Sequence, residues 1–168
     1  MLRRILADGE LASAIVFTRT KHRAKRLARQ LAQSGHRAVA LQGNMSQGQR
    51  ERAMNGFRDR RFDVLVATDI AARGIDVQQV SHVVNFDMPN TTDAYTHRIG
   101  RTGSSDRQGK AYTFVTVYDH DLVTQVERRL GSAIPRREVE GIASAPFPQS
   151  RPTNRTTGSD NPGGNAAG

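Results

Sequence analysis

Short apolar runs alternate with segments of helical periodicity along most of this chain. The predicted elements, in chain order, are a strand at Ala14–Thr18, a helix at Lys21–Gln33, a strand at Ala38–Leu41, a helix at Gln47–Phe57, a strand at Asp63–Ala67, a strand at His82–Phe86, a helix at Asp93–Ile99, a strand at Ala111–Val117 and a helix from about His120 to Leu130. This alternation is typical of a parallel sheet covered by helices. We therefore expect an α/β fold of three layers, with a mainly parallel sheet flanked by helices.

Capping residues support the predicted helix boundaries. Thr20 and Ser46 stand where N-caps are expected, and Gln49 completes a capping-box pattern with Ser46. Gly35 follows the first long helix, where a glycine commonly ends a helix. The two longest predicted helices therefore have signals at their ends that agree with their apolar periodicity.

Composition adds a basic charge to this picture. The chain has 168 residues, enough for one domain with a core, and its 25 Lys and Arg against 16 Asp and Glu give a formal charge of +9. Such a charge favours a polyanionic partner. Because cysteine is absent, disulfide scaffolds and thiolate zinc sites are excluded. No apolar run approaches the ~18 residues of a membrane span, so we expect a soluble, cytoplasmic protein with no membrane partner.

The composition changes near the C-terminus. From Pro146 onward the chain is rich in Pro, Gly, Asn, Ser and Thr and has almost no apolar residue after Phe147. Such a segment buries too little apolar surface to offset the entropy of folding. We expect residues 1–145 to form the domain and residues 146–168 to form a disordered polar tail.

Polar and glycine-rich clusters follow the predicted strands. They are Thr18–Thr20, Gln42–Asn44, Thr68–Asp76 and a helix-to-loop cluster at His97–Gly109. In open parallel sheets the ligand crevice lies at the carboxyl ends of the strands. We expect all four clusters to share one rim of the sheet.

Several complete active sites are missing from the sequence. A P-loop needs G-x-x-x-x-G-K-[ST], and the nearest match, Gly103–Ala111, has one residue too many, ends in Ala and precedes a strand. The histidines show no ligand spacing, and no G-x-S-x-G elbow is present. We therefore predict neither a metal site nor a self-contained catalytic centre.

Two stretches nevertheless suit the binding of phosphate and ribose. In VATDIAARGIDV (66–77), a buried strand leads into a turn whose backbone N–H groups, with Thr68 and Arg73, could bind phosphate, while Asp76 could accept from a ribose hydroxyl. In YTHRIGRTG (95–103), Arg98 and Arg101 share a helical face beside two glycines. Taken alone, the first stretch could also be a capped turn without a ligand, and the second could also be a solvated basic helix end.

Together these stretches resemble motifs V and VI of the DEAD-box RNA helicases. AIVFTRT (14–20) is similar to motif IV, and LQGNMSQGQRERAMNGF (41–57) is similar to the family's G-x-M-x-Q-x-x-R stretch, so the resemblance covers roughly residues 1–130. It implies the second, C-terminal RecA-like domain, P-loop NTPase-like but without the P-loop. In the family that loop, the Q motif and the DEAD motif belong to the preceding domain.

The resemblance implies a role for each matching residue. Asp76 would hydrogen-bond the ATP ribose, Gly74 would also belong to the cofactor site, and Arg101 would be the arginine finger on the γ-phosphate. His97 and Arg98 would act at the interface with the N-terminal RecA-like domain, Arg98 there or on RNA. The implied RNA-binding residues are Thr18, Arg19, Gly43, Thr68, Asp69, Arg73 and Gly74. ATP with Mg²⁺ would be held mainly by the absent domain, and RNA would be bound with little sequence preference.

The sequence departs from the family pattern at two places. The family usually continues motif VI as GRTGR, whereas Ser104 stands here in place of the second arginine, and Arg107 follows one helical turn later. We expect weaker hydrolysis unless Arg107 substitutes in part. Gln42 and Asn44 stand where His and Asp are common, which affects the expected RNA contacts.

Two interpretations of the whole chain follow. The first is the C-terminal half of an ATP-dependent RNA helicase, inactive alone. The alternative is a stand-alone RNA-binding or scaffold module with a degenerate helicase domain, favoured by Ser104 but opposed by the presence of Arg101, Asp76 and His97. The helix at 21–33 has an apolar stripe (Ala24, Leu27, Ala28 and Leu31) and an outward basic face, which is either solvated or an auxiliary RNA-binding surface.

Overall fold

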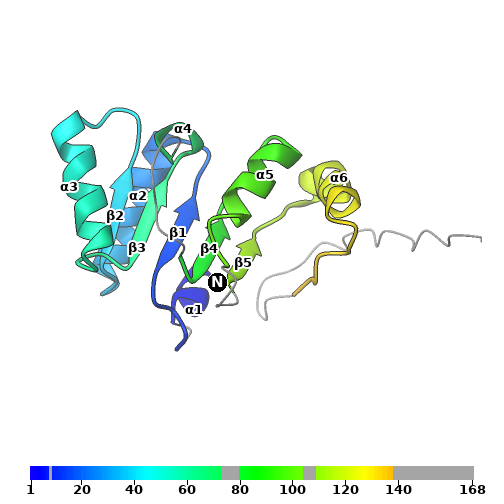
Figure 1. The fold of residues 1–168 in the computed structure, drawn as a ribbon, viewed down its shortest axis with the longest axis horizontal. Helices are drawn as coiled ribbons and strands as arrows, with labels where there is room; N and C mark the ends of the chain where they lie inside the picture. The colour runs from blue at the N-terminus through cyan, green and yellow to red at the C-terminus, as the bar shows by residue number, and fades with distance from the viewer. Residues whose placement is uncertain (8, 73–79, 104–108, 138–168) are drawn as a thin grey trace, which may run out of the picture.

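A five-stranded parallel sheet forms the centre of the molecule in this computed structural model, which describes residues 1–7, 9–72, 80–103 and 109–137. The strands are β1 (Ala14–Phe17), β2 (Ala38–Leu41), β3 (Val64–Ala67), β4 (His82–Asn85) and β5 (Lys110–Thr113). Their spatial order is β2-β3-β1-β4-β5, and every neighbouring pair is parallel (Figure 1). The parallel sheet predicted from the sequence is confirmed.

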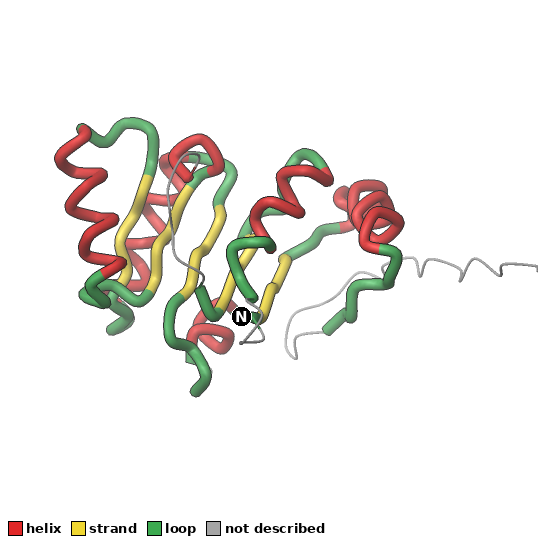
Figure 2. The backbone as a smooth tube through the Cα atoms, viewed as in Figure 1, coloured by secondary structure: helices red, strands yellow, loops and turns green. Residues whose placement is uncertain are grey.

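Helices lie on both sides of the sheet, which Figure 2 shows as a row of strands between helices. They are α1 (Leu2–Leu6), α2 (Lys21–Gln33), α3 (Gln47–Arg58), α4 (Asp69–Ala72), α5 (Thr92–Ile99) and α6 (His120–Leu130), with a short 3₁₀ helix, η1 (Val117–Asp119), before α6. Each predicted helix is present, with bounds that differ by a residue at most at α3 and α5. The short α1 and the 3₁₀ turn were not predicted.

Two apolar clusters fill the two faces of the sheet. Ala14 and Val16 of β1 pack with the apolar stripe of α2, whereas Ile15 and Phe17 pack with α3 and α4. Because successive side chains of a strand point to opposite faces, a central strand covered on both sides must be apolar at every position. All four residues of β1 are buried, as the continuous apolar run predicts.

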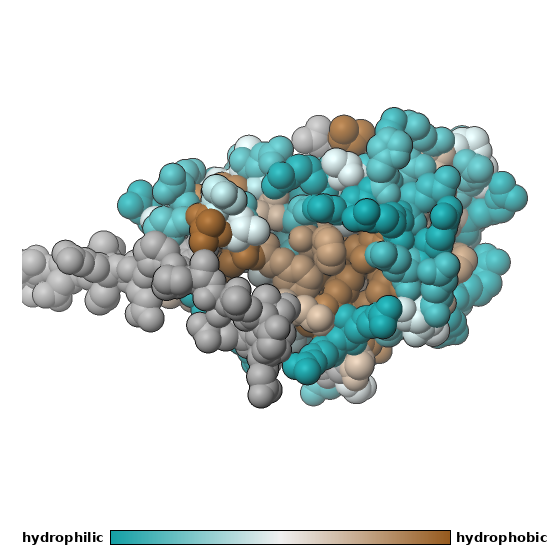
Figure 3. Space-filling view, turned by 180° about the vertical axis from the view of Figure 1, so that it is seen from behind, coloured by the Kyte–Doolittle hydropathy of each residue, from teal (hydrophilic) through white to brown (hydrophobic). Residues whose placement is uncertain are grey.

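The face that carries α1 and α2 is not apolar throughout. Figure 3 shows it from behind, with an apolar area in the middle and hydrophilic side chains over the part of the molecule that holds α2 and α3. Lys25, Arg26 and Arg29 of α2 are exposed, while its predicted apolar stripe is buried. The outward direction of the basic residues is therefore confirmed. None of the helices in the described residues is long and apolar enough to cross a membrane.

Helix caps and one shortened strand account for the local differences. The Thr20 hydroxyl accepts from the Arg23 N–H at 3.2 Å, and Ser46 and Gln49 form the predicted capping box. Gly35, with φ of +87°, ends α2 in the left-handed region, which glycine tolerates best. The last strand stops at Thr113, short of the predicted Val117, because β4, its only strand partner within the described residues, ends at Asn85.

Candidate functional site

Three of the four predicted polar clusters lie side by side at the carboxyl edge of the sheet. Phe17 of β1 is level with Ala67 of β3 and with Asn85 of β4, and Ala67 is level with Leu41 of β2. The residues that follow these four strand ends, 18–20, 42–44, 68–69 and 86–87, therefore share one edge, which we call the carboxyl edge. The parallel register produces this arrangement because all the strands end at the same height.

The fourth cluster departs from the prediction. Helix α5 returns the chain toward the start of β4, where Thr102 forms a parallel bridge with Val80 and donates a hydrogen bond from its hydroxyl to the Val80 carbonyl at 2.7 Å. The Arg101 carbonyl accepts from the Val80 N–H at 3.0 Å. Arg101 is thus at the amino edge of β4, and the single rim of four clusters expected from the sequence is wrong. The physical reason is that a crossover helix runs antiparallel to its strands.

Arg98 connects α5 to the carboxyl edge. Its Nε and Nη2 atoms donate to the two carboxylate oxygens of Asp69, each at 2.7 Å. Its Nη1 atom donates to the Asn85 side-chain oxygen and to the Asp87 carbonyl, both at 3.0 Å. The guanidinium carbon lies 5.0 Å from the centroid of the Phe17 ring. We call Arg98 with Asp69, Asn85 and Asp87 the arginine clamp.

The burial of Arg98 depends on these partners. Its side chain is 4% exposed, and a charge with so little contact with water is tolerated only when its donors find oriented acceptors. A guanidinium can engage a carboxylate with two parallel hydrogen bonds and still have a third nitrogen for neutral oxygens, which a lysine cannot do. Arg98 therefore holds α4, β4 and α5 together, and its side chain is buried in this structure.

Asp87 and Asn85 were missed by the sequence analysis. Asp87 accepts from the backbone N–H of Arg19 at 2.9 Å and forms an ion pair with Arg23 of α2. Asn85 is fully buried and donates from its amide to the Thr113 hydroxyl at 3.0 Å. A signal was available, because an asparagine inside the apolar run HVVNF must find a buried partner. Its partner, Arg98, could not be identified from sequence spacing.

The expected RNA-binding residues differ in how far they reach the surface. Arg19 and Gly43 are exposed, and there is open space around the Gly43 α-carbon. Thr68 is 8% exposed, and its carbonyl accepts from the Ala72 N–H at 2.9 Å, which starts α4. Thr18 is fully buried. The carboxyl edge thus offers the side chain of Arg19 and the backbone around Gly43, with Thr18 beneath them.

Two segments far apart in the sequence fix the position of α4. Arg50 of α3 donates to the Ala71 carbonyl at 3.1 Å, and Arg98 binds Asp69 at the other end of the same short helix. A helix this short leaves its terminal carbonyls without partners inside the helix, so outside donors must bind them. Ile70, between the two anchors, is 79% exposed. Helix α4 is therefore held at both ends by side chains of other helices, while its Ile70 side chain is exposed to solvent.

The predicted nucleotide contacts lie partly outside the described residues. His97 is exposed and Arg101 is half-buried, both at the end of α5. Arg73, Gly74 and Asp76 fall outside the described residues, as do Ser104 and Arg107. Within the described ranges no group of three His, Asp or Glu side chains lies close enough together to hold a metal ion.

Comparison with known families and proteins identifies relatives of this architecture. The model of the helicase conserved C-terminal domain matches residues 1–106. The DEAD-box ATP-dependent RNA helicase 21 of Oryza sativa subsp. japonica is 47% identical over 129 residues, which are 77% of this chain and 18% of that protein. The ATP-dependent RNA helicase SrmB of Escherichia coli is 41% identical over 159 residues, which are 94% of this chain and 35% of that protein. The chain therefore spans about a third or less of these curated relatives.

Solved structures agree with the fold. The crystal structure of the E. coli DEAD-box protein SrmB, bound to regulator of ribonuclease activity A, superposes with a TM-score of 0.80 and 41% identity, covering 89% of this chain and 88% of that one. The C-terminal domain of the DEAD-box protein Dbp5 has a TM-score of 0.71 and 34% identity, covering 77% of this chain and 76% of that one. The RecA-like architecture expected from the sequence is confirmed.

Proposed function

Because this chain belongs to the DEAD-box RNA helicases, as their conserved C-terminal helicase domain, we propose that it is one half of an ATP-driven machine that unwinds or remodels RNA duplexes. The other half would be an N-terminal RecA-like domain that binds most of the ATP and its Mg²⁺. Alone, the chain would neither hydrolyse ATP nor unwind RNA. Its location in the cytoplasm stays a prediction.

The carboxyl edge supports the proposed RNA track. The segments at 18–20, 42–44 and 68–69 end three adjacent parallel strands, so they form a continuous polar line. We assign the track to Thr18, Arg19, Gly43, Thr68, Arg73 and Gly74, with Asp69 shaping α4 because both its carboxylate oxygens bind Arg98. Contacts of this kind reach phosphate and ribose groups, which carry no base identity.

The end of α5 supports the proposed catalytic contribution. Arg101 would stabilise the charge that develops on the γ-phosphate, His97 would couple to the other domain, and Asp76 with Gly74 would hold the ribose. When the two domains close, ATP and RNA would each be bound across both of them. Closure would bend the RNA strand and disrupt a short duplex, and hydrolysis would restore the open state.

The observation that carries the proposal is that one helix, α5, connects the proposed RNA track at the carboxyl edge with the proposed arginine finger. Helix α5 is fixed to the carboxyl edge through Arg98 and Asp69, and Arg101 follows its C-terminal end, at the amino edge of β4. A displacement of the RNA edge would therefore move the finger, because the clamp is buried and closely packed. Arg98 would act as a positioning residue, in place of the direct contact with RNA or partner expected from the sequence.

The test is ATP hydrolysis by this chain joined to a matching N-terminal RecA-like domain, with and without RNA. We expect activity only in the combined protein, and Arg101→Ala should lower kcat by about 10³-fold or more. Arg26→Ala, an exposed arginine on α2, is the matched control and should leave kcat unchanged. Hydrolysis by the chain alone, or equal activity of Arg101→Ala, would refute the proposal.

Ser104 favours a second candidate function, a stand-alone RNA-binding or scaffold module. It replaces the arginine with which the family usually ends motif VI, and serine cannot supply that positive charge. In the combined protein, Ser104→Arg should raise kcat if hydrolysis is limited at this position. A combined protein that binds RNA but hydrolyses no ATP, with or without the added arginine, would favour the module instead.

A further inference from the structure

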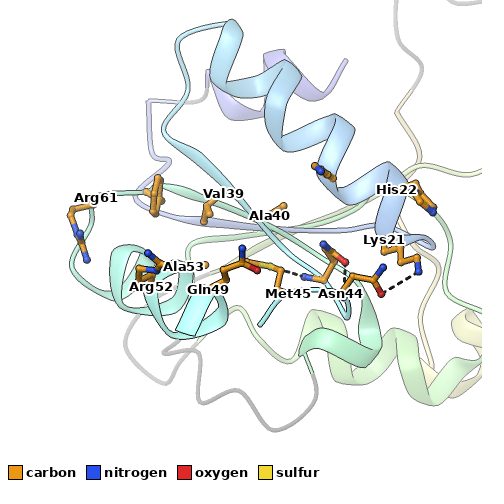
Figure 4. Close-up of a pocket in the computed structure, with 13 residues that line it drawn as sticks. Lys21, His22, Val39, Ala40, Asn44, Met45, Gln49, Arg52, Ala53 and Arg61 are labelled. Atoms are coloured by element: carbon orange, nitrogen blue, oxygen red, sulfur yellow. Dashed lines mark hydrogen bonds between the residues drawn. The ribbon is translucent and has the colours of Figure 1, made fainter. Parts of the chain in front are cut away.

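A groove of about 700 Å³ runs along the outer edge of β2, away from the residues assigned to ATP. Its floor is formed by β2, and its two walls come from α2 and from α3 with the loop that follows it. Figure 4 shows Lys21 and His22 at one end, Arg61 at the other, and Val39 and Ala40 along the strand between them. We call this the β2 groove.

The floor of the groove is an edge strand. Within the described residues β2 pairs only with β3, so no strand occupies its other side. The Arg37 carbonyl, just before β2, accepts from Val64 of β3, and alternate residues of a parallel strand direct their backbone groups to opposite sides. The backbone N–H and carbonyl of Ala40 and the carbonyl of Ala38 are therefore directed toward the groove, whereas the Ala38 N–H donates to the His36 carbonyl at 2.9 Å. Such an edge is a template for an added strand.

The two walls differ in chemistry. On the α3 side the groove is lined by the apolar side chains Val39, Met45, Ala53 and Phe62, all of one apolar cluster. Gln49, Arg52 and Arg61 line the same side beside them. On the α2 side it is lined by Lys21, His22 and Lys25. A strand laid along β2 would alternate its side chains between these walls, because successive side chains point to opposite faces.

The apolar wall is shaped by close packing. The Phe62 ring lies against Gly56 of α3 so closely that a β-carbon there would come within 2.5 Å of a ring atom. A larger residue at position 56 would push the ring outward into the groove. The half-buried Phe62 therefore keeps its place as a wall because α3 has a glycine beneath it.

The charge of the groove is unbalanced. None of the described residues that line it is acidic, while Lys21, Lys25, Arg52 and Arg61 are basic. Nearby carboxylates are engaged elsewhere, since Asp63 binds Arg37 with two hydrogen bonds of 2.8 and 2.6 Å. One basic lining residue does have an acidic neighbour: Arg61 forms a long, exposed ion pair with Asp59 at 3.4 Å. An occupant that brings carboxylates to the α2 side would complement this charge.

We propose that the β2 groove docks an extended segment of a partner protein as an added strand, with acidic side chains toward α2 and apolar side chains toward α3. Main-chain hydrogen bonds to β2 would provide affinity and the two walls would provide selectivity. A protein segment fits better than an RNA strand, because RNA offers no strand-like backbone donors and its phosphates gain nothing from the apolar wall. This docking surface adjoins the proposed RNA track at Gln42 and Asn44, and its lining residues do not include the finger.

The probe is a phage-displayed library of 12-residue peptides selected on the whole 168-residue chain, followed by fluorescence anisotropy with the enriched peptides. We expect the enriched sequences to alternate acidic and apolar residues. Lys25→Glu with Arg52→Glu, one change on each wall, should weaken their binding about tenfold or more. N-methylation of a backbone amide in the centre of a peptide should weaken it by a similar factor, of order tenfold, because it removes a ladder hydrogen bond.

The matched control is Arg26→Glu with Arg29→Glu, the same change of charge on exposed residues of α2 outside the groove. At about 0.15 M salt, where screening acts over ~8 Å, the control should change affinity less than about twofold. Circular dichroism of both variants checks that they remain folded.

Four results of the peptide measurements would overturn the proposal. The first two are a selection that enriches no peptide, or only peptides without alternation, and an equal loss of affinity in the two double variants. The other two are no effect of N-methylation, and displacement of the peptide by a 12-nucleotide uridine RNA whose own affinity falls in Lys25→Glu with Arg52→Glu. The last result would assign the groove to RNA. A concentration-dependent dimer in sedimentation that only this variant abolishes would assign it to a second copy of the chain.

Discussion

Helix α2 and helix α5 both carry basic residues, but they place them in different environments. Lys25, Arg26 and Arg29 of α2 are exposed, whereas Arg98 of α5 is 4% exposed and binds three other residues. The basic side chains of α2 therefore extend into water. The Arg98 side chain of α5 is buried where α4, β4 and the residue Asp87 provide hydrogen-bond acceptors.

The difference shows that charge density does not locate a functional arginine. The α2 face is the densest basic run of the sequence, yet Lys25, Arg26 and Arg29 are exposed, and the apolar stripe packs on the opposite side of the helix. Arg98 comes from a sparser stretch, and its direction is set by Asp69, Asn85 and the Asp87 carbonyl. A buried charge costs several kcal/mol when its partners are missing, so its environment must be specific.

The largest effect should come from removing the clamp. Arg98→Ala should lower the free energy of unfolding by about 3–5 kcal/mol, because it strips Asp69 and Asn85 of their partner. Arg98→Lys should still be clearly destabilising, since lysine lacks the planar fork. Urea denaturation followed by circular dichroism measures both, with Arg26→Ala as the exposed control. A loss under about 1 kcal/mol for Arg98→Ala would show that burial of this arginine has no energetic consequence.

The second-largest loss of stability should come from Asn85, a buried polar residue of β4 that binds Arg98. Asn85→Ala removes an acceptor of Arg98 and a donor to Thr113, and should cost about 1–3 kcal/mol. In a double-mutant cycle with Arg98→Ala, the two losses should not add, with a coupling of order 1 kcal/mol. Strict additivity of the two losses would mean that the clamp does not act as a unit. Thr113→Ser, which keeps the hydroxyl, is the mild control.

A smaller effect should be equal in the two helices. Thr20 caps α2 and Thr91 caps α5, with hydroxyl oxygens that accept backbone N–H groups at 3.2 and 3.1 Å. Thr20→Ala and Thr91→Ala should therefore each cost about 1 kcal/mol, and the serine variants only a few tenths. Thermal unfolding measures the four proteins together. A markedly larger loss at Thr91 would indicate that the cap and the clamp of α5 are coupled.

The smallest effect on stability should come from α2. Arg26→Glu with Arg29→Glu should change the free energy of unfolding by no more than about 0.5 kcal/mol, because both side chains are exposed. The salt dependence of RNA binding is the sharper measurement. An auxiliary RNA surface predicts a shallower slope of log K against log salt in this variant, and a solvated face predicts an unchanged slope.

The sequence was sufficient for the scaffold because local patterns specify it. The alternation of Lys21–Gln33 with the apolar runs on either side predicts β1, α2 and β2 to within a residue, and Ser46 with Gln49 identifies a capping box that the structure contains. Its limits appear at the last strand, which ends where its partner β4 ends. A strand length that depends on the neighbouring strand cannot be found in the strand's own residues.

The candidate site could be predicted only in part. Three polar clusters lie together at the carboxyl edge. This could be predicted without knowing the order of the strands, because parallel strands that end at the same level bring the residues after them to one edge. The position of Arg101 depended on where α5 returns, and the bridge between Val80 and Thr102 places it at the other edge. The β2 groove is likewise invisible in sequence, because it exists only where two helices flank an edge strand.

By itself the sequence determined the class of fold, the family and the residue types available for phosphate and ribose contacts, since each of these is encoded in short stretches with fixed spacing. The tertiary structure decided which arginine is buried, which edge each motif occupies and which strand is left open. Those properties depend on partners distant in sequence, such as Asp69 for Arg98, whose approach is set by how the helices pack on the sheet. Whether a charged side chain such as Arg98 is buried depends on how the helices and the sheet pack together, so it cannot be determined from one segment of the sequence.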